Sequence, residues 1–168
     1  MRIRNSLGLA MSTLALVSMI NYTAQAKQTE YEESIVYTED STQIKCLALN
    51  VYFEARGESR IGQKAVAWVT LNRVKSGKYA DNICDVVWED NQFEWTNDGK
   101  SDKPKDMVAF AEAMFIAYDV LQDYGHTEDP TEGSVMFHAA SSDPYWEDKY
   151  EKVTRIDNHI FYKEGSDG

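Results

Sequence analysis

The sequence predicts an α+β domain in which helices come first and a small antiparallel sheet follows late in the chain. Apolar residues recur at helical spacing in several segments between residues 44 and 124, whereas short apolar runs typical of strands follow Pro130. The chain has 168 residues, of which 43% are hydrophobic, as in an ordinary globular protein. Helices followed by strands favour the α+β class.

Residues 1–26 have the features of an export signal peptide. Arg2 and Arg4 form a basic end, residues 7–20 are uncharged and mostly apolar, and Ala24-Gln25-Ala26 matches a signal-peptidase site. The alternative is an uncleaved, weakly apolar membrane anchor. Because both interpretations place the rest of the chain outside the cytoplasm, we expect an exported, periplasmic or extracellular protein. After cleavage we expect no stable membrane insertion.

Residues 27–43 are expected to form an acidic flexible linker. They contain five acidic residues, one lysine and few large aliphatic side chains, so they cannot bury enough surface to offset the entropy of ordering. Asp40, Ser41 and Thr42 can cap a helix. We therefore expect the folded domain to cover residues 44–164.

Two helices with a very short connection are expected to open this domain. Apolar residues at helical spacing predict a helix of about 13 residues starting near Ile44, and Gly57 is expected to end it in a left-handed conformation. The second helix is expected from about Arg60 to Lys75, after the capping residue Ser59.

A short helix and a third long helix are expected to complete the helical part. The short helix is predicted over residues 82–88. Pro104 suits the first turn of the long helix, which ends before Gly125. Its wide apolar face predicts that it is the central helix of the core.

The end of the chain predicts the small sheet. Residues 134–140 have the composition of a strand. Residues 153–156 and 159–162 flank the two-residue joint Asp157-Asn158, which predicts a hairpin.

Cys46 and Cys84 are expected to form a disulfide. In an oxidising compartment two cysteines allow a single intramolecular pairing, and neither lies in a motif of a reactive cysteine. The cross-link closes a loop of about 40 residues and is expected to stabilise the fold by about 3–4 kcal/mol.

Charge argues against a nucleic-acid-binding protein, and histidine spacing argues against a zinc enzyme. With 28 acidic and 17 basic residues the net charge is -11, and no Lys/Arg cluster offsets it, so nucleic acid is not an expected partner. His126, His138 and His159 invite comparison with zinc amidases, but their spacing matches no compact metal motif. We expect no metal and no cofactor.

Ionisable residues are concentrated at the end of the first helix, in the segment NVYFEARGE. Tyr52 and Phe53 flank Glu54, and shielding by these rings raises the pKa of a carboxyl through desolvation. Glu58 follows four residues later, where a second carboxyl makes each harder to ionise. A carboxylic acid protonated near neutral pH can donate to the leaving oxygen of a glycosidic bond. On spacing alone, however, solvent-facing helix residues are the favoured interpretation.

The segment VYFEARGE, followed by GQKAVAWVTLNRV, ICDVVW, NQFEWTNDGKSD, FHA and HIFY, closely resembles the catalytic domain of the SleB-type cell-wall hydrolases. This family comprises spore-cortex-lytic enzymes and related phage and bacterial peptidoglycan hydrolases. The resemblance extends from about Cys46 to Tyr162. It implies a lysozyme-like fold of the lytic-transglycosylase type and cleavage between N-acetylmuramic acid and N-acetylglucosamine, with Glu54 as the catalytic acid/base.

The mechanism implied by the resemblance needs one carboxyl group. Glu54 protonates the glycosidic oxygen and then accepts the proton of the sugar's own 6-hydroxyl, which leaves a 1,6-anhydro end. A second catalytic carboxylate, required of ordinary glycosidases, is then unnecessary. Three alternatives remain: a lysozyme-like hydrolase that places water through Glu58, Glu94 or Asp98, an N-acetylmuramoyl-L-alanine amidase, and a non-catalytic wall-binding module.

Peptidoglycan glycan strands are the expected partner of a monomeric protein. The candidate sugar-binding residues combine amides, hydroxyls and aromatic faces, although Phe93 is equally compatible with a core position. Because peptidoglycan is itself anionic, we expect short-range contacts rather than long-range attraction to hold it. The candidates are Glu58, Asn72, Gln92, Phe93, Trp95, Thr96, His138 and Tyr145, with Trp146 as a further lining residue; for Glu58 a structural role is preferred.

Overall fold

The computed structural model describes residues 21–23, 25, 27 and 40–165 of a chain that divides into two units, residues 1–40 and 41–168. In the first unit, residues 21–23, 25 and 27 are helical. Most of the expected signal peptide and linker lies outside the described residues. Within the described ranges, no helix is both long and apolar enough to span a membrane.

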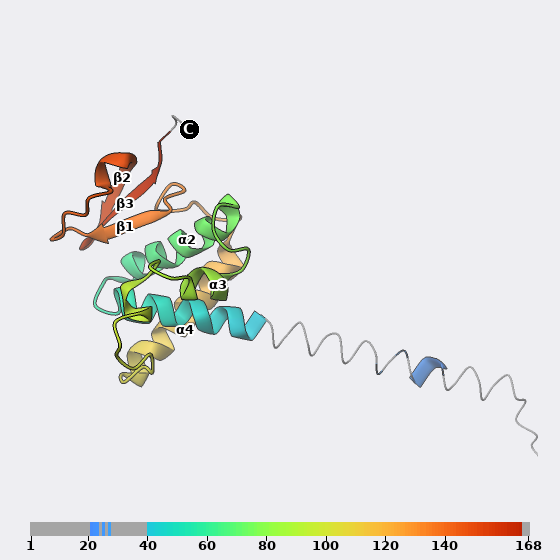
Figure 1. Ribbon diagram of the computed structural model, residues 1–168. Helices are drawn as coiled ribbons and strands as arrows, with labels where there is room; N and C mark the ends of the chain where they lie inside the picture. Colours follow the sequence, from blue (N-terminus) through green and yellow to red (C-terminus); the bar gives the residue numbers. More distant parts are fainter. Residues whose placement is uncertain (1–20, 24, 26, 28–39, 166–168) are drawn as a thin grey trace, which may run out of the picture. The chain divides into compact units, whose positions relative to one another are not determined.

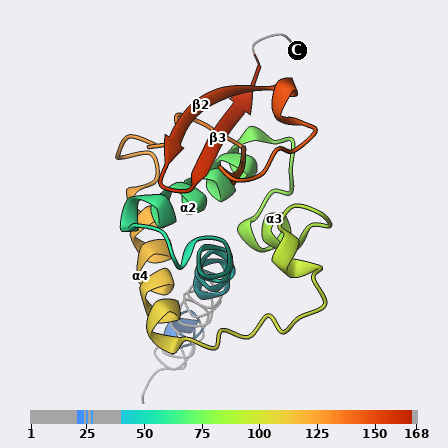
Figure 2. The same ribbon diagram turned by 90° about the vertical axis from the view of Figure 1, so that its left-hand side faces the viewer.

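The second unit begins with its helices (Figures 1 and 2). One helix covers residues 41–55, and residue 40 is already helical, so this helix begins earlier than the expected residue 44. In Figure 2 it is seen end-on between α3 and α4. The later helices are α2 (Arg60–Ser76), α3 (Ile83–Trp88) and α4 (Met107–Asp123), with a short 3-10 helix, η1 (Glu94–Thr96), between the last two.

A three-stranded antiparallel sheet follows the helices, which confirms the α+β class (Figure 1). Its order is β1-β3-β2, with β1 (Met136–Ala139), β2 (Tyr150–Ile156) and β3 (His159–Glu164). A second 3-10 helix, η2 (Glu147–Lys149), precedes β2. The hairpin of β2 and β3 turns at Asp157, whose φ is 50°, and Asn158, as the sequence predicts.

The core is centred on the helix over residues 41–55 and on α2, and not on α4. Leu47, Val51 and Val69 are fully buried. On α4 only a narrow stripe of four residues is buried, whereas Met107 and Phe115 are more than half exposed. The expectation that α4 is the central helix is therefore wrong: apolar residues surround it, so their pattern does not reveal which side faces the core.

The ends of the helices depart from the expectations at two positions. Ser59 caps α2 and Gly77 ends it with a φ of 68°, as expected. Gly57 does not have a positive φ, so it is not the predicted left-handed stop. The cap of α4 is Asp106, whose carboxylate accepts hydrogen bonds from two backbone amides, and Pro104 lies before the helix.

The disulfide between Cys46 and Cys84 is confirmed. The Cα atoms of the two cysteines lie 5.2 Å apart. It joins the helix over residues 41–55 to α3, across 38 positions of sequence. The cross-link therefore holds together two helices that the chain itself connects only through α2.

A set of carboxylate contacts fastens the sheet to the start of α2. Asp157 accepts hydrogen bonds from the backbone amide and the hydroxyl of Ser59, at 2.9 and 2.5 Å. Glu58 accepts from the backbone amide and the side chain of Asn158, each at 3.1 Å. Gly62 has no side chain that would meet the carboxylate of Asp157, and this permits the close approach.

We predict that Gly62→Ala destabilises the domain by about 1–3 kcal/mol, because the added methyl group overlaps Asp157 Oδ2 and lies about 3.0 Å from Glu58 Cβ. Urea unfolding with the disulfide intact measures this change. Gly57→Ala is the matched control, since nothing lies within 4 Å of its added methyl group and its φ is not positive. Equal stability of the two variants would contradict the prediction.

Candidate active site

Glu54 lies in the last turn of the helix over residues 41–55 and is partly buried. The preceding residue, Phe53, stacks on Trp95 with ring centroids 4.6 Å apart. The indole N–H of Trp95 donates to the side chain of Asn50 at 3.0 Å, and Asn50 in turn donates to Thr70 of α2 at 3.0 Å. This buried network fixes the end of the helix, and with it the position of Glu54.

The surroundings of Glu54 favour its protonated form. Burial, and next the nearby carboxylate of Glu94, raise its pKa from 4.5 to about 7. Arg73 acts in the opposite direction. The sequence predicted a raised pKa but named Glu58 as the neighbouring carboxyl; that assignment is wrong, because Glu58 faces Asn158 and Glu94 takes its place.

Arg73 is a buried basic residue of α2 that faces the same site. Its Nε donates to the carbonyl oxygen of Val135, just before β1, at 2.7 Å. The guanidinium lies over the ring of Phe93 at 4.7 Å and that of Tyr79 at 5.4 Å, whereas its Nη1 is buried and has no hydrogen-bond partner among the described residues. Burial lowers its pKa, while Tyr79 and Glu54 act to raise it. Arg73 therefore places positive charge beside Glu54 without forming a direct ion pair with it.

The two aromatic candidates of the 92–96 stretch are mainly structural. Phe93 and Trp95 are buried, with 3% and 8% of their surface exposed, so neither offers a broad open face to a sugar. Gln92 and Thr96 are partly buried, and the hydroxyl of Thr96 donates to the carbonyl of Phe93 at 2.9 Å. No side-chain hydrogen bond of Gln92 is found in the described part of the chain, so its amide is available for a new polar contact.

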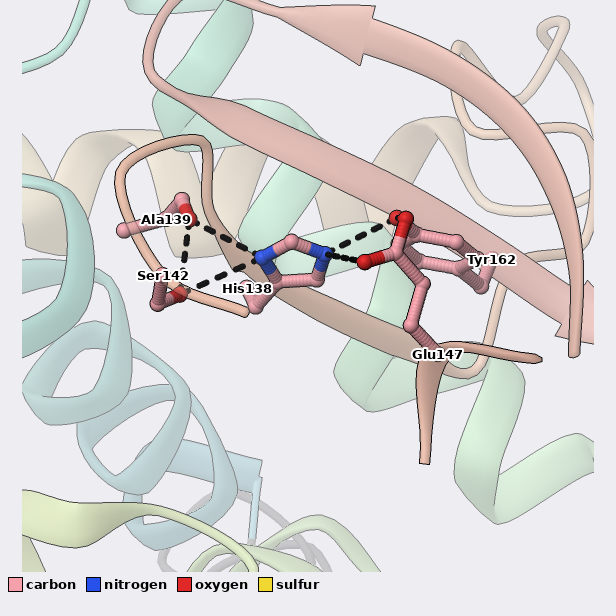
Figure 3. A network of polar contacts seen from close by, with 5 residues as sticks. All are labelled: His138, Ala139, Ser142, Glu147 and Tyr162. Atoms are coloured by element: carbon pink, nitrogen blue, oxygen red, sulfur yellow. Dashed lines mark hydrogen bonds and ion pairs between the residues drawn. The ribbon is translucent and has the colours of Figure 1, made fainter. Parts of the chain in front are cut away.

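His138 belongs to a hydrogen-bonded network within the sheet (Figure 3). Its Nε2 lies 2.8 Å from the hydroxyl of Tyr162, which donates to Glu147 at 2.6 Å. Its Nδ1 lies 2.9 Å from the carbonyl oxygen of Ala139 and 3.2 Å from the hydroxyl of Ser142. Burial, and next Glu147, raise the pKa of Tyr162, so the phenol stays a donor. Both ring nitrogens of His138 are thus engaged within the protein, and its expected contact with substrate stays a prediction.

Three other candidates have partners elsewhere in the domain. The amide of Asn72 donates to Asp129 at 2.7 Å and to the carbonyl of Ser134 at 3.1 Å, and it lines a separate hollow of about 580 Å³. Tyr145 is 89% exposed and contacts Lys149, while Trp146 packs edge-on against His138. Their roles as sugar-binding residues stay predictions.

The expected structural role of Glu58 agrees with its hydrogen bonds to the hairpin. The neighbouring His159 has a pKa lowered by burial, and its ring packs edge-on against Phe137 at 5.2 Å.

Among the described residues, no group of three His, Cys, Asp or Glu side chains is arranged to hold a metal ion.

Sequence reasoning missed Arg73, Asn50 and Glu147. Arg73 and Asn50 both interrupt apolar stripes at helical spacing, and a polar residue in such a stripe is the signal that indicates a buried, paired group. Glu147 carries no such signal, since it lies in an acidic turn and reaches Tyr162 only through the fold of the sheet.

Comparison with known proteins gives consistent results. A family model described as Cell Wall Hydrolase matches residues 57–162, a range that begins after Glu54. The spore cortex-lytic enzyme of Halalkalibacterium halodurans is 34% identical over 119 residues, which cover 70% of this chain and 34% of that protein. The spore cortex-lytic enzyme of Bacillus subtilis is 30% identical over 119 residues, which cover 70% and 36%. The chain thus spans about a third of the length of these two relatives.

Solved structures support the same relationship. The crystal structure of the catalytic domain of the Bacillus cereus SleB protein superimposes with a TM-score of 0.59 at 29% identity, covering 72% of this chain and 89% of that one. The catalytic domain of the germination-specific lytic transglycosylase SleB from Bacillus anthracis gives a TM-score of 0.59 at 28% identity, covering 72% and 93%. These matches confirm the fold that the resemblance implies. Since the family model covers more than half of the sequence, the chain belongs to the cell wall hydrolase family.

Proposed function

We propose that this protein cleaves the glycan strands of peptidoglycan between N-acetylmuramic acid and N-acetylglucosamine, as a lytic transglycosylase with Glu54 as its acid/base. The observation that carries the proposal is a partly buried carboxyl with a pKa of about 7 at the end of a fixed helix. Family membership supports it, as does the similarity to a domain named as a lytic transglycosylase.

The proposed reaction uses one carboxyl group twice. Protonated Glu54 donates to the oxygen that joins the two sugars, so the bond to C1 of the muramic acid breaks and positive charge develops there. The resulting carboxylate accepts the proton of the 6-hydroxyl as O6 attacks C1. The products are a 1,6-anhydro end and a free 4-hydroxyl, no water is consumed, and Glu54 is protonated again.

A hydrolase is the second candidate function, and the position of the Glu94 carboxylate near Glu54 favours it. Its carboxylate is near enough to raise the pKa of Glu54, and a hydrolase needs a second carboxylate to position water or to act as a nucleophile. Asp98 is less suitable because its carboxylate is already engaged, by the backbone amide of Lys100 at 2.8 Å and by its ammonium group at 3.0 Å.

We also propose that the protein acts outside the cytoplasm. The signal-like pattern of residues 1–26 supports export. The disulfide between Cys46 and Cys84 supports an oxidising compartment.

We predict that Glu54→Gln lowers glycan cleavage by about 10²- to 10⁴-fold while the protein still folds and binds sacculi, because the amide cannot donate the proton. Turbidity loss of purified sacculi measures cleavage, and a pull-down measures binding. Glu112→Gln, a change at an exposed residue of α4, is the control and retains activity. Near-normal cleavage by Glu54→Gln would rule out the assignment.

The pH dependence of kcat/KM is expected to reflect Glu54. Because the acid must be protonated, the rate falls tenfold per pH unit above a pKa of about 7. Glu94→Gln removes a negative charge that raises this pKa. The fall of kcat/KM at high pH is therefore expected to begin at lower pH in this variant. The pH profile of Glu112→Gln is expected to match that of the wild type. An unshifted pH profile in Glu94→Gln would show that Glu94 does not act on the catalytic acid.

Product analysis separates the candidate reactions. A transglycosylase releases muropeptides with 1,6-anhydro ends, each lighter by one water than the reducing ends made by a hydrolase, and an amidase releases free stem peptides. We expect anhydro ends by mass spectrometry, from the wild type and from Glu94→Gln alike. Reducing ends, together with loss of all cleavage in Glu94→Gln, would establish the hydrolase instead.

A further inference from the structure

A groove of about 490 Å³ lies beside the candidate active site. One wall is the end of the helix over residues 41–55, and the other is the connection over residues 98–106 that leads to α4. Phe53 and Trp95, the stacked pair next to Glu54, also line it. Its volume is in the range of sites that bind small ligands.

The charges around this groove differ from those of the chain as a whole. The chain has 28 acidic and 17 basic residues, yet Arg56, Lys100, Lys103 and Lys105 line this groove. The expectation that no Lys/Arg cluster offsets the negative charge is wrong here, because folding brings Arg56 beside three lysines of the connection. We call this feature the basic groove.

Two of the three acidic residues of the basic groove are already engaged. Asp98 forms an ion pair with Lys100 at 3.0 Å. Asp106 accepts hydrogen bonds from the first amides of α4, both at 3.0 Å. Asp102 is the remaining carboxylate on the wall.

Three of the four basic residues remain available to an anion. In the described part of the chain, no ion pair joins Arg56, Lys103 or Lys105 to a carboxylate. Arg56 lies over the ring of Tyr52 at 5.0 Å, which holds its guanidinium at the wall. Once Lys100 is paired with Asp98, three cations remain against the carboxylates of Asp102 and Asp106. The groove therefore has a net positive charge, although the protein as a whole is negative.

This chemistry does not match a neutral sugar, which is bound by aromatic faces and neutral hydrogen-bonding groups. Peptidoglycan carries its carboxylates on the peptide stem attached to muramic acid, the sugar whose bond Glu54 is proposed to break. Arginine binds carboxylates through two parallel hydrogen bonds, and lysine adds point charges.

We propose that the basic groove binds the carboxylates of the peptide stem while the glycan strand lies at Glu54, so that the enzyme prefers strands with charged stems. The assignment rests on the proposed function, because it takes the glycan strand to bind at Glu54. Arg56, Lys103 and Lys105 are then specificity-determining residues and take no part in bond cleavage.

The test is a double charge reversal, Lys103→Glu with Lys105→Glu, made in the Glu54→Gln background so that binding is measured without turnover. The probes are soluble glycan strands with intact tetrapeptide stems, and the same strands after carbodiimide and ammonia have converted the carboxyls to amides. We expect the reversal to weaken binding of the charged strands by about tenfold and to leave binding of the amidated strands unchanged.

The matched control is Lys45→Glu with Lys152→Glu, which changes the net charge equally at two exposed lysines outside the groove. It should bind both probes as the parent does. Equal losses on both probes, or the same loss in the control, would overturn the proposal. Turnover by the wild type is scored separately, so a failure of glycan cleavage is distinguishable from a failure of stem recognition.

Discussion

The burial of the Arg73 guanidinium is the constraint on which the rest of the site depends. A buried cation is costly to desolvate unless polar partners surround it. Here the partners are the carbonyl of Val135 and the faces of two aromatic rings, and no ion pair with Glu54 is found among the described residues. A direct ion pair would hold Glu54 ionised, whereas Arg73 at this position ties α2 to the residue before β1 and lowers the pKa of Glu54 by less than burial raises it.

The same arrangement explains why Glu94 matters more than Glu58. The stacking of Phe53 on Trp95 brings η1 against the end of the helix over residues 41–55, and Glu94 lies in η1. Glu58 is closer to Glu54 in sequence, but its carboxylate is used to hold the hairpin. Proximity in sequence therefore predicted the right kind of effect on the pKa of Glu54 but the wrong neighbouring carboxylate.

The sequence predicted the elements better than their contacts. Periodicity and capping residues located α2 and the hairpin because those signals are local. The central helix was misassigned because α4 is apolar on several sides, and burial depends on what packs against it. The basic groove was missed for a similar reason: Arg56 and Lys103 are far apart in sequence and meet only through the connection before α4. Glu54 was recognised through resemblance, since its spacing alone favoured an ordinary surface residue.

The raised pKa of Glu54 also affects folding stability. In the unfolded chain the carboxyl titrates near its ordinary pKa of 4.5, and in the folded protein near 7. Below pH 4.5 the carboxyl is protonated in both states, so its raised pKa does not change the free energy of unfolding. As pH rises from 4.5 to 7 the unfolded chain releases the proton first, so stability falls, by up to about 3 kcal/mol above pH 7. The cross-link from Cys46, on the same helix, to Cys84 supplies about 3–4 kcal/mol, enough to offset that loss. The helix can thus carry a desolvated acid because it is covalently fixed elsewhere.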